Sequence, residues 1–299
     1  SSTVDQAYSK DKVLAAMQPI EYAIEGEVHR EIPPPLEYPK DTSPLQAIRQ
    51  RGVLTVGYDP QGLPFSFFNS KNELVGFDIE MTQALADELG VEIAYFPYDK
   101  REMAKDLNGH RRYDLLVGGL FATPRRLESM RFSEPYLDLH LAFIVADHRK
   151  DEFSNLSQLR RLEQLRIGVL ERPYFGTRLE QAVPSAEIVL LDSPRKFFEQ
   201  SHDFDALVMS AEAGSAWTLL HPKYSVVVPE DAQLTVSVGY PMPATALRLE
   251  NVVSRWIDLK RKDGTIQALY NHWIEGRTAE KSSPRWCILT DVLGASSYR

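Results

Sequence analysis

Short apolar runs alternate with longer amphipathic stretches along most of this chain. The runs are bounded by polar residues or glycine, and they lie at 53–56, 93–96, 115–117, 141–145, 167–170 and 206–209. Buried strands of α/β sheets have this continuous apolar pattern, and the stretches between the runs have the spacing of helices. The alternation therefore predicts an α/β fold.

Two of the amphipathic stretches also carry helix end signals. The first, 78–89, is followed by Gly90, which suits the left-handed residue that closes many helices. The second, 251–262, ends shortly before Gly264. Its apolar side is expected to consist of Val252, Val253, Trp256 and Leu259. Both helices are expected to serve packing.

The composition excludes several classes of protein. With 299 residues the chain is long enough for about two domains. Its formal net charge of −8 disfavours a nucleic-acid or anionic-membrane partner, because either would need a basic surface. Its one cysteine, Cys287, excludes an intramolecular disulfide and multi-cysteine metal sites. The histidines occur singly, and no metal or cofactor is expected.

The sequence also lacks membrane and export signals. No stretch approaches the roughly twenty apolar residues that a transmembrane helix needs. Residues 1–30 lack the charged start and apolar core of a signal peptide. The sequence is therefore expected to be a mature chain or a part of a larger protein.

A glycine turn next to arginines is the strongest chemical signal in the sequence. Residues 118–126 read GGLFATPRR, and FSEPY follows at 132–136. The guanidinium of arginine is a planar fork of donors that matches a carboxylate, and glycines let backbone N–H groups approach the same ligand. The motif predicts a carboxylate-binding corner at Gly119 and Arg126, unless Arg125 and Arg126 are only the exposed end of a basic loop.

Six separated motifs, in the right order, resemble the polar-amino-acid type of periplasmic solute-binding proteins over residues 45–275. Along the chain they are the segment 45–57, DP at 59–60 with PFSF at 64–67, GFDIE at 76–80, YDLLVGG at 113–119, the glycine turn with its arginines, and KDGT at 262–265 with Trp273. The resemblance implies an α/β fold of the two-lobed, type II periplasmic-binding-protein kind. The ligand cleft would lie between the lobes, at the carboxyl ends of the strands.

In that family the chain crosses between the lobes twice. The resemblance implies crossings after 143–145 and near 234–238. Lobe one would then consist of residues 45–146 and 237–275, and lobe two of residues 147–236.

The two ends lie outside these lobes. Residues 1–44 begin with an amphipathic stretch, which predicts a helix, and pass into a proline-rich segment that is typical of a stiff, extended spacer. Residues 276–299 are similar to the tail of receptor domains that are fused to a cation:dicarboxylate symporter.

The resemblance also implies ligand contacts in lobe one. Arg126 aligns with the arginine that pairs with the ligand's α-carboxylate, and Gly119 aligns with the adjoining backbone contact. Asp59 aligns with an acidic residue that often contacts a polar ligand side chain, although an Asp-Pro turn explains it equally well. Phe65 and Phe121, in the same motifs, complete this set of candidates.

Several positions depart from the family's amino-acid pocket. Ser210 stands where an aspartate that holds the ligand's α-ammonium is usual, and Lys100 stands where a tryptophan is usual. The pair Arg172-Pro173 stands where a small Gly-Thr pair is usual, and Tyr174 follows this pair. Glu212 would replace the missing aspartate only if its loop is shifted.

These departures add cations and remove an anion, so they favour an anionic ligand over an amino acid. Arg126, Arg172 and Lys100 could together hold a dicarboxylate or another small anionic metabolite. Alternatively, Arg172 and Lys100 are solvated surface charges, and the ligand is an amino acid.

The main functional prediction is a receptor in the periplasm, or on the outer face of the inner membrane, that closes by hinge motion around a small carboxylate-bearing ligand and serves transport. Its partner would be a membrane transporter or a sensor module, covalently fused or separate. The alternatives are an amino-acid-binding receptor, the sensor domain of a signalling protein, and a degenerate pocket that binds no small molecule.

An enzyme is not expected. Some members of the superfamily resemble dehydratases for prephenate-like acids, which need a general acid in the cleft, here Glu171 or Glu212. A general acid needs burial to raise its pKa, and the sequence shows no such burial. Specific catalytic spacings, such as a nucleophile elbow or a phosphate loop, are absent from the sequence.

Overall fold

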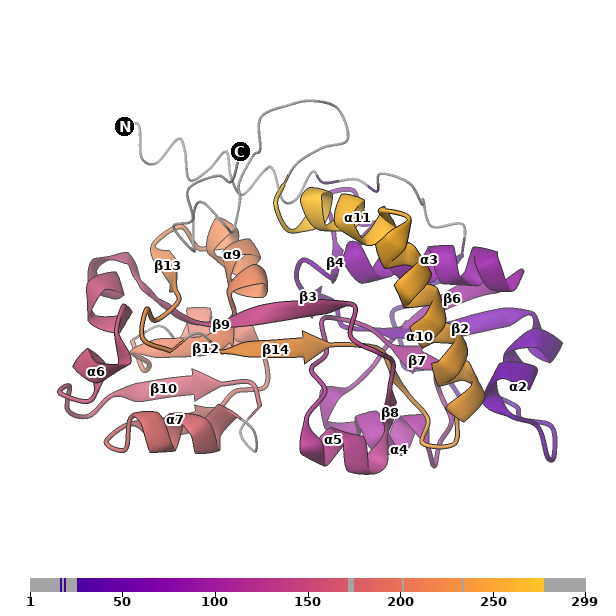
Figure 1. Cartoon of the computed structure of the whole chain (residues 1–299), viewed down its shortest axis with the longest axis horizontal. Helices are drawn as coiled ribbons and strands as arrows, with labels where there is room; N and C mark the ends of the chain where they lie inside the picture. The colour runs from indigo at the N-terminus through magenta and orange to yellow at the C-terminus, as the bar shows by residue number, and fades with distance from the viewer. Residues whose placement is uncertain are drawn as a thin grey trace.

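The computed structural model describes residues 17, 19, 26–171, 175–200, 202–232 and 234–276. These residues form two α/β lobes that lie side by side and are joined by long strands (Figure 1). The two-lobed α/β architecture expected from the sequence is confirmed. Among the described residues, no helix has both the length and the apolar character that crossing a membrane requires.

Lobe one is built on a parallel four-stranded sheet in the order β1-β6-β2-β7. Its strands are β1 (Glu27–Val28), β2 (Val53–Tyr58), β6 (Glu92–Pro97) and β7 (Leu115–Leu116). Its helices are α2 (Pro44–Arg51), α3 (Phe77–Leu89), η1 (Lys100–Glu102), α4 (Met103–Leu107), α5 (Pro124–Ser129), α10 (Leu247–Lys262) and α11 (Thr265–Trp273). The short strands outside this sheet are β3 (Gln61–Gly62), β4 (Ser66–Phe68), β5 (Leu74–Val75), β8 (Arg131–Phe132) and β15 (Pro241–Met242).

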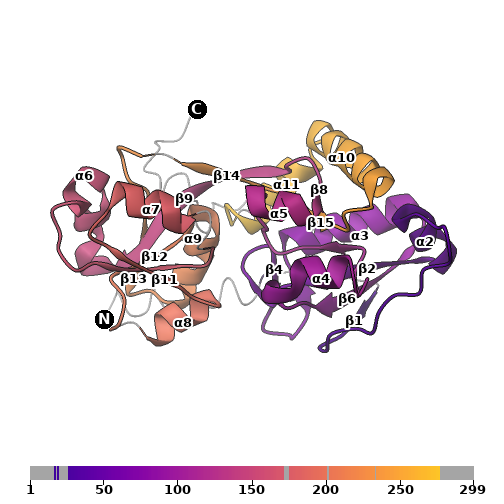
Figure 2. The ribbon, with the colours of Figure 1, turned by 90° about the horizontal axis from the view of Figure 1, so that it is seen from below.

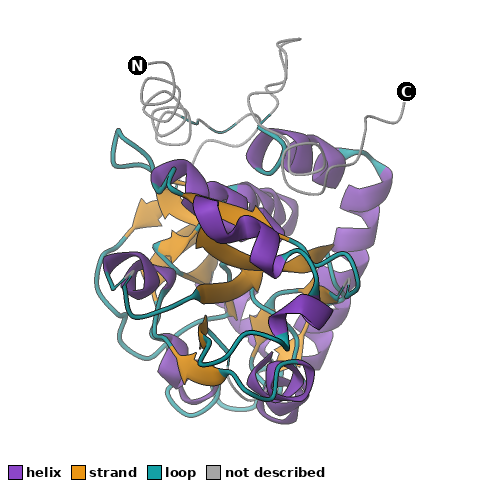
Figure 3. Ribbon diagram, turned by 90° about the vertical axis from the view of Figure 1, so that its left-hand side faces the viewer, coloured by secondary structure: helices purple, strands orange, loops and turns teal. Residues whose placement is uncertain are grey.

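Lobe two has a mixed sheet in the order β11-β10-β12-β9-β13. Its strands are β9 (Leu137–Ala146), β10 (Arg166–Val169), β11 (Glu187–Leu190), β12 (Ala206–Ser210) and β13 (Tyr224–Val227). Its helices are η2 (Asp147–Phe153), α6 (Leu156–Leu159), α7 (Thr177–Ala182), α8 (Pro194–Glu199) and α9 (Ala211–Leu220). In the end-on view, helices flank the strands of this lobe (Figure 3).

Two antiparallel strands connect the lobes. The first half of β9 pairs with β14 (Thr235–Val238), so that the outgoing and returning connections lie side by side, and β14 runs between the lobes (Figure 2). From Leu141 on, β9 pairs with β12 of lobe two. With ten residues, β9 is long enough to serve both the connection and the second sheet. The strand therefore enters lobe two earlier than the boundary at residue 146 that the sequence suggested.

The segment 26–43, which we call the strap, is extended as expected but packs along lobe one. Its strand β1 pairs with β6, and the Tyr58 hydroxyl donates to the His29 carbonyl at 2.6 Å. The Leu36 N–H donates to the Arg111 carbonyl at 2.7 Å. The strap is thus a part of the lobe and not a free spacer. The helix predicted near the N-terminus and the tail after residue 276 lie outside the described residues.

The two helices with end signals form where the sequence predicts them. α3 ends at Gly90, which has a φ of 67° and donates to the Ala86 carbonyl. α10 begins at Leu247, earlier than predicted, and Leu259 is 60% exposed although it was expected on the packing side. Gly264, with a φ of 86°, separates α10 from α11.

Candidate functional site

Two adjoining cavities lie between the lobes. The inner compartment has a volume of about 70 Å³, and the outer compartment has a volume of about 990 Å³. Both are lined by residues of lobe one and of lobe two. Four charged residues line both compartments: Asp59, Lys100, Arg126 and Glu171. This border between the compartments is the candidate binding site.

The structure brings together most of the site residues proposed from the sequence. The inner compartment is lined by Asp59, Phe65, Lys100, Gly119, Phe121, Arg126 and Ser210. The other two candidates, Arg172 and Tyr174, lie outside the described residues. The ligand contacts themselves stay a prediction for all nine residues.

The glycine turn is held in place by the buried carboxylate of Asp78, which the sequence had suggested only as a helix start. Its Oδ2 accepts from the N–H groups of Gly118 and Gly119 at 2.8 and 3.1 Å. The Gly119 N–H is therefore engaged within the fold. Burial raises the pKa of Asp78 to about 6, although its hydrogen bonds oppose this shift. A Cβ added at Gly119 would lie 2.6 Å from the ring of Phe65, so only glycine fits this turn.

Arg126 lies in the short helix α5, which Thr123 caps at its N-terminus. Its Nη1 donates to the Phe121 carbonyl at 2.9 Å, which fixes the direction of the guanidinium. Its Nη2 forms an ion pair with the Glu171 carboxylate of lobe two. In this structure the carboxylate-binding corner therefore holds a carboxylate of the protein itself.

Lys100 also forms an ion pair, in this case with Asp59. Its Nζ lies 3.6 Å from Oδ2 of Asp59, whose other oxygen accepts from the Gln61 N–H at 2.9 Å. Each cation that lines both compartments is therefore paired with an anion. The four charges at the border of the two compartments balance, while Arg172, the third cation of the predicted cationic site, lies outside the described residues.

The remaining lobe-two candidates have structural partners. The Ser210 side chain caps α9 by accepting from the Ala213 N–H at 3.1 Å. Glu212 is 1% exposed and accepts from the backbone N–H of His140 at 3.0 Å, while its other oxygen lies 2.8 Å from Nδ1 of that residue. The hypothesis that Glu212 replaces the missing aspartate is wrong, because hinge strand β9 already holds its carboxylate.

Two aromatic residues at the site were not found from the sequence. Phe175 forms an edge-to-face contact with Phe121 across the cleft, with ring centroids 5.5 Å apart, and Trp217 lines the inner compartment. No motif marks either residue in the sequence. Among the described residues, no group of three or more His, Cys, Asp or Glu side chains is arranged to hold a metal ion.

Comparison with known proteins gives the family. Residues 54–276 match the bacterial extracellular solute-binding proteins, family 3. The chain belongs to this family. The family resemblance and the type II fold that the sequence motifs predicted for this family 3 protein are both confirmed.

The relatives of this family 3 protein include both binding proteins and an enzyme. It is 26% identical over 240 residues to the cyclohexadienyl dehydratase of Pseudomonas aeruginosa, covering 79% of this chain and 87% of the relative. It is 26% identical over 235 residues to the L-cystine-binding protein TcyJ of Escherichia coli, covering 78% and 86%. The sequence-based prediction excluded an enzyme. This exclusion is wrong, because a dehydratase is among these relatives.

One similar solved structure is related both to the binding proteins and to the dehydratase. An ancestral amino-acid-binding protein, described as a precursor of cyclohexadienyl dehydratase, has a TM-score of 0.69 and 26% sequence identity to this family 3 protein. The similarity covers 78% of this chain and 100% of the ancestral protein.

Proposed function

We propose that this protein is a receptor outside the cytoplasmic membrane that binds an amino acid at the border of the two compartments. The observation that carries this proposal is the ion pair between Arg126 of lobe one and Glu171 of lobe two. An amino acid carries both charges of this pair. Its carboxylate would take Arg126 and its ammonium would take Glu171, so the ligand would bridge the lobes as the ion pair now does.

The balance of charge supports a zwitterion over a dicarboxylate. Asp59 and Glu171 already neutralise Lys100 and Arg126. A dicarboxylate would have to displace both acids and leave them without a cation, which is unfavourable. A zwitterion adds no net charge, and the relative TcyJ, an L-cystine-binding protein, is consistent with this ligand class.

Closure by the two connecting strands is the proposed mechanism. β9 and β14 pair side by side between the lobes, so that a small change in their twist turns one lobe relative to the other. The ligand shifts the population towards the closed state by its differential affinity for that state. A membrane transporter is the proposed partner, and a sensor module is the alternative.

Calorimetric titration of the protein with the common amino acids and with succinate tests this function. Arg126→Ala should weaken amino-acid binding about 30-fold or more, because the ligand carboxylate loses its main donor. The far-UV circular dichroism and melting temperature should stay close to those of the wild type. Arg248→Ala is the control, since this exposed arginine lies on α10 and lines neither compartment.

Two results would contradict the proposal. If succinate bound more tightly than every amino acid, the ligand class would be wrong. If Arg126→Ala bound amino acids like the wild type, the carboxylate would be held elsewhere.

A dehydratase is the second candidate function. Glu171 places a carboxyl group beside the cleft arginine, and the chain aligns with 87% of a cyclohexadienyl dehydratase. In this function Arg126 holds a carboxylate of the substrate, and Glu171 protonates the hydroxyl that leaves as water. The ring carboxylate leaves as CO2, and the electrons of its broken C–C bond complete the aromatic ring. Incubation with a cyclohexadienyl acid, followed by the ultraviolet absorbance of an aromatic product, tests it. Product formation by the wild type but not by Glu171→Gln supports the enzyme, and no product from the wild type excludes it.

A further inference from the structure

The outer compartment is far larger than the inner one. Its volume of about 990 Å³ lies at the top of the range of roughly 300–1,000 Å³ that holds drug-sized ligands. The inner compartment, at about 70 Å³, has room for only a few water molecules. Because Arg126 lines both, a ligand whose carboxylate binds Arg126 has to place its remaining atoms in the outer compartment.

The walls of the outer compartment carry exposed apolar side chains from both lobes. Ile32 comes from the strap and is 51% exposed, and Leu190 comes from β11 of lobe two and is also 51% exposed. Leu191 and Met103, which are buried, line the same compartment. A ligand with an apolar end would cover the exposed side chains, at about 25 cal/mol for each Å² removed from water.

Two polar side chains of this compartment lack partners. Tyr98 is 8% exposed, and its hydroxyl makes no hydrogen bond with any described residue. A Cβ at Gly118 would lie 3.4 Å from this hydroxyl and 3.1 Å from Cβ of Asp59, which places the hydroxyl at the glycine turn. Oε1 of Gln61 is likewise buried and has no partner in the described part of the chain. A hydroxyl donor and a carbonyl acceptor complement the two polar groups of an amide.

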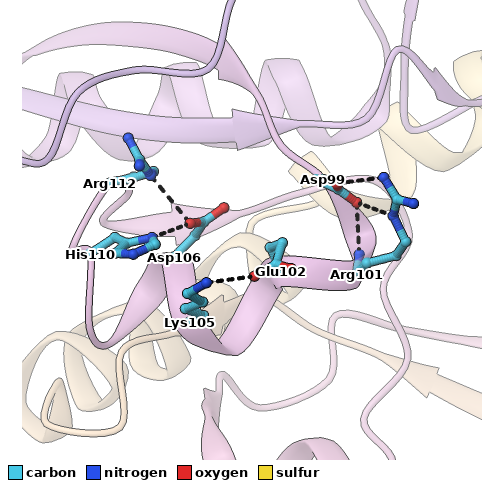
Figure 4. A network of polar contacts seen from close by, with 7 residues as sticks. All are labelled: Asp99, Arg101, Glu102, Lys105, Asp106, His110 and Arg112. Carbon is cyan, nitrogen blue, oxygen red and sulfur yellow. Dashed lines mark hydrogen bonds and ion pairs between the residues drawn. The ribbon is translucent and has the colours of Figure 1, made fainter.

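Two charged side chains that line the outer compartment, Arg101 and Asp192, are already paired. The guanidinium of Arg101 in lobe one donates to both carboxylate oxygens of Asp99 (Figure 4). Its Nε lies 3.1 Å from Oδ1, and its Nη2 lies 3.0 Å from Oδ2. On lobe two, Asp192 forms an ion pair with Lys196. These pairs reduce the charge that the compartment presents to a ligand.

We propose that the outer compartment is a subsite for the extended side chain of the ligand, and that the ligand is an amino acid whose side chain carries a substituted amide. The charged head would lie at Arg126 and Glu171, the amide at Tyr98 and Gln61, and the apolar substituent between Ile32 and Leu190. Glutamine whose side-chain amide nitrogen carries an apolar alkyl group belongs to this class, because it has one carboxylate and one ammonium and adds no net charge; γ-glutamyl-isobutylamide is an example. The inference rests on the proposed amino-acid receptor.

Calorimetric titration with γ-glutamyl-isobutylamide, glutamine and alanine tests the subsite. The wild type should bind γ-glutamyl-isobutylamide at least about tenfold more tightly than glutamine. Leu190→Ser should remove most of this advantage without changing the affinity for glutamine. Leu259→Ser is the matched control, because this exposed leucine lies on α10 and lines neither compartment.

Tyr98→Phe tests the amide contact separately, since it removes one oxygen that makes no internal hydrogen bond. It should weaken binding of γ-glutamyl-isobutylamide and glutamine about threefold to tenfold. Binding of alanine, which has no amide, should not change, and the variant should be at least as stable as the wild type.

The outcomes separate this inference from the function on which it rests. If alanine or glutamine binds but γ-glutamyl-isobutylamide binds no better, the subsite is wrong and the receptor stands. If Leu190→Ser and Tyr98→Phe change nothing, the subsite is also wrong. If none of the three compounds binds, while Arg126→Ala behaves like the wild type, the proposed receptor fails as well.

Discussion

At the scale of single residues, Asp78 is the group with the clearest pH dependence. Burial raises its pKa to about 6, so the folded protein holds a proton that the unfolded chain releases above about pH 4. This group therefore favours folding most at low pH. Its contribution falls by roughly 3 kcal/mol as the pH rises from about 4 to 6 and is then constant.

The variant Asp78→Asn should remove this slope, because asparagine keeps an oxygen for the glycine turn but does not titrate. The measurement is the free energy of unfolding by urea at several pH values between 4 and 7. Asp87→Asn is the control, since it lies on the exposed side of the same helix. If Asp78→Asn showed the same slope as the control, the buried carboxyl would not be its source.

A local motif of glycines and arginines marks Arg126 and Gly119 in the sequence, and both residues line the inner compartment. The sequence does not predict their partners. Glu171 lies 45 positions from Arg126 along the chain, and Asp78 lies 41 positions from Gly119. Such pairs depend on how the lobes fold and meet, and nothing in the local sequence encodes this. The interpretation of the ligand as a dicarboxylate counted the cations Arg126 and Lys100. It did not include their acidic partners Glu171 and Asp59.

At the scale of elements, the strap is the clearest difference from expectation. Proline-rich composition does predict an extended segment, and the segment is extended. Composition cannot predict that its backbone groups pair with lobe one, as in the bonds of His29 and Leu36. By contrast, the strands and the helix α3 follow from periodicity and from Gly90, because both signals are local.

Removing the strap should destabilise lobe one. A chain that starts at Ser43 should unfold with a free energy roughly 2–4 kcal/mol lower than a chain that starts at Gly26, at about 1 kcal/mol for each buried hydrogen bond lost. Urea denaturation of the two chains, measured side by side, isolates the strap from the residues before it. Equal midpoints would show that the strap only lies on the surface of the lobe.

At the scale of the whole molecule, the ion pair between Arg126 and Glu171 joins the two lobes. Without ligand, Glu171→Ala should raise the radius of gyration in small-angle scattering, because the open population grows when this contact is lost. Asp192→Ala is the control, since Asp192 pairs within lobe two with Lys196. The same radius in wild type and Glu171→Ala would mean that other contacts hold the lobes.

The same ion pair has a consequence for when a receptor responds. Because Glu171 belongs to the same chain as Arg126, its carboxylate competes with the ligand at a constant effective concentration. The measured affinity is reduced in proportion to the fraction of molecules in which Arg126 is free. A simple carboxylate leaves Glu171 without a cation, whereas a zwitterion satisfies both partners. In the proposed receptor, the pair would therefore set a concentration threshold and would also select amino acids over small acids.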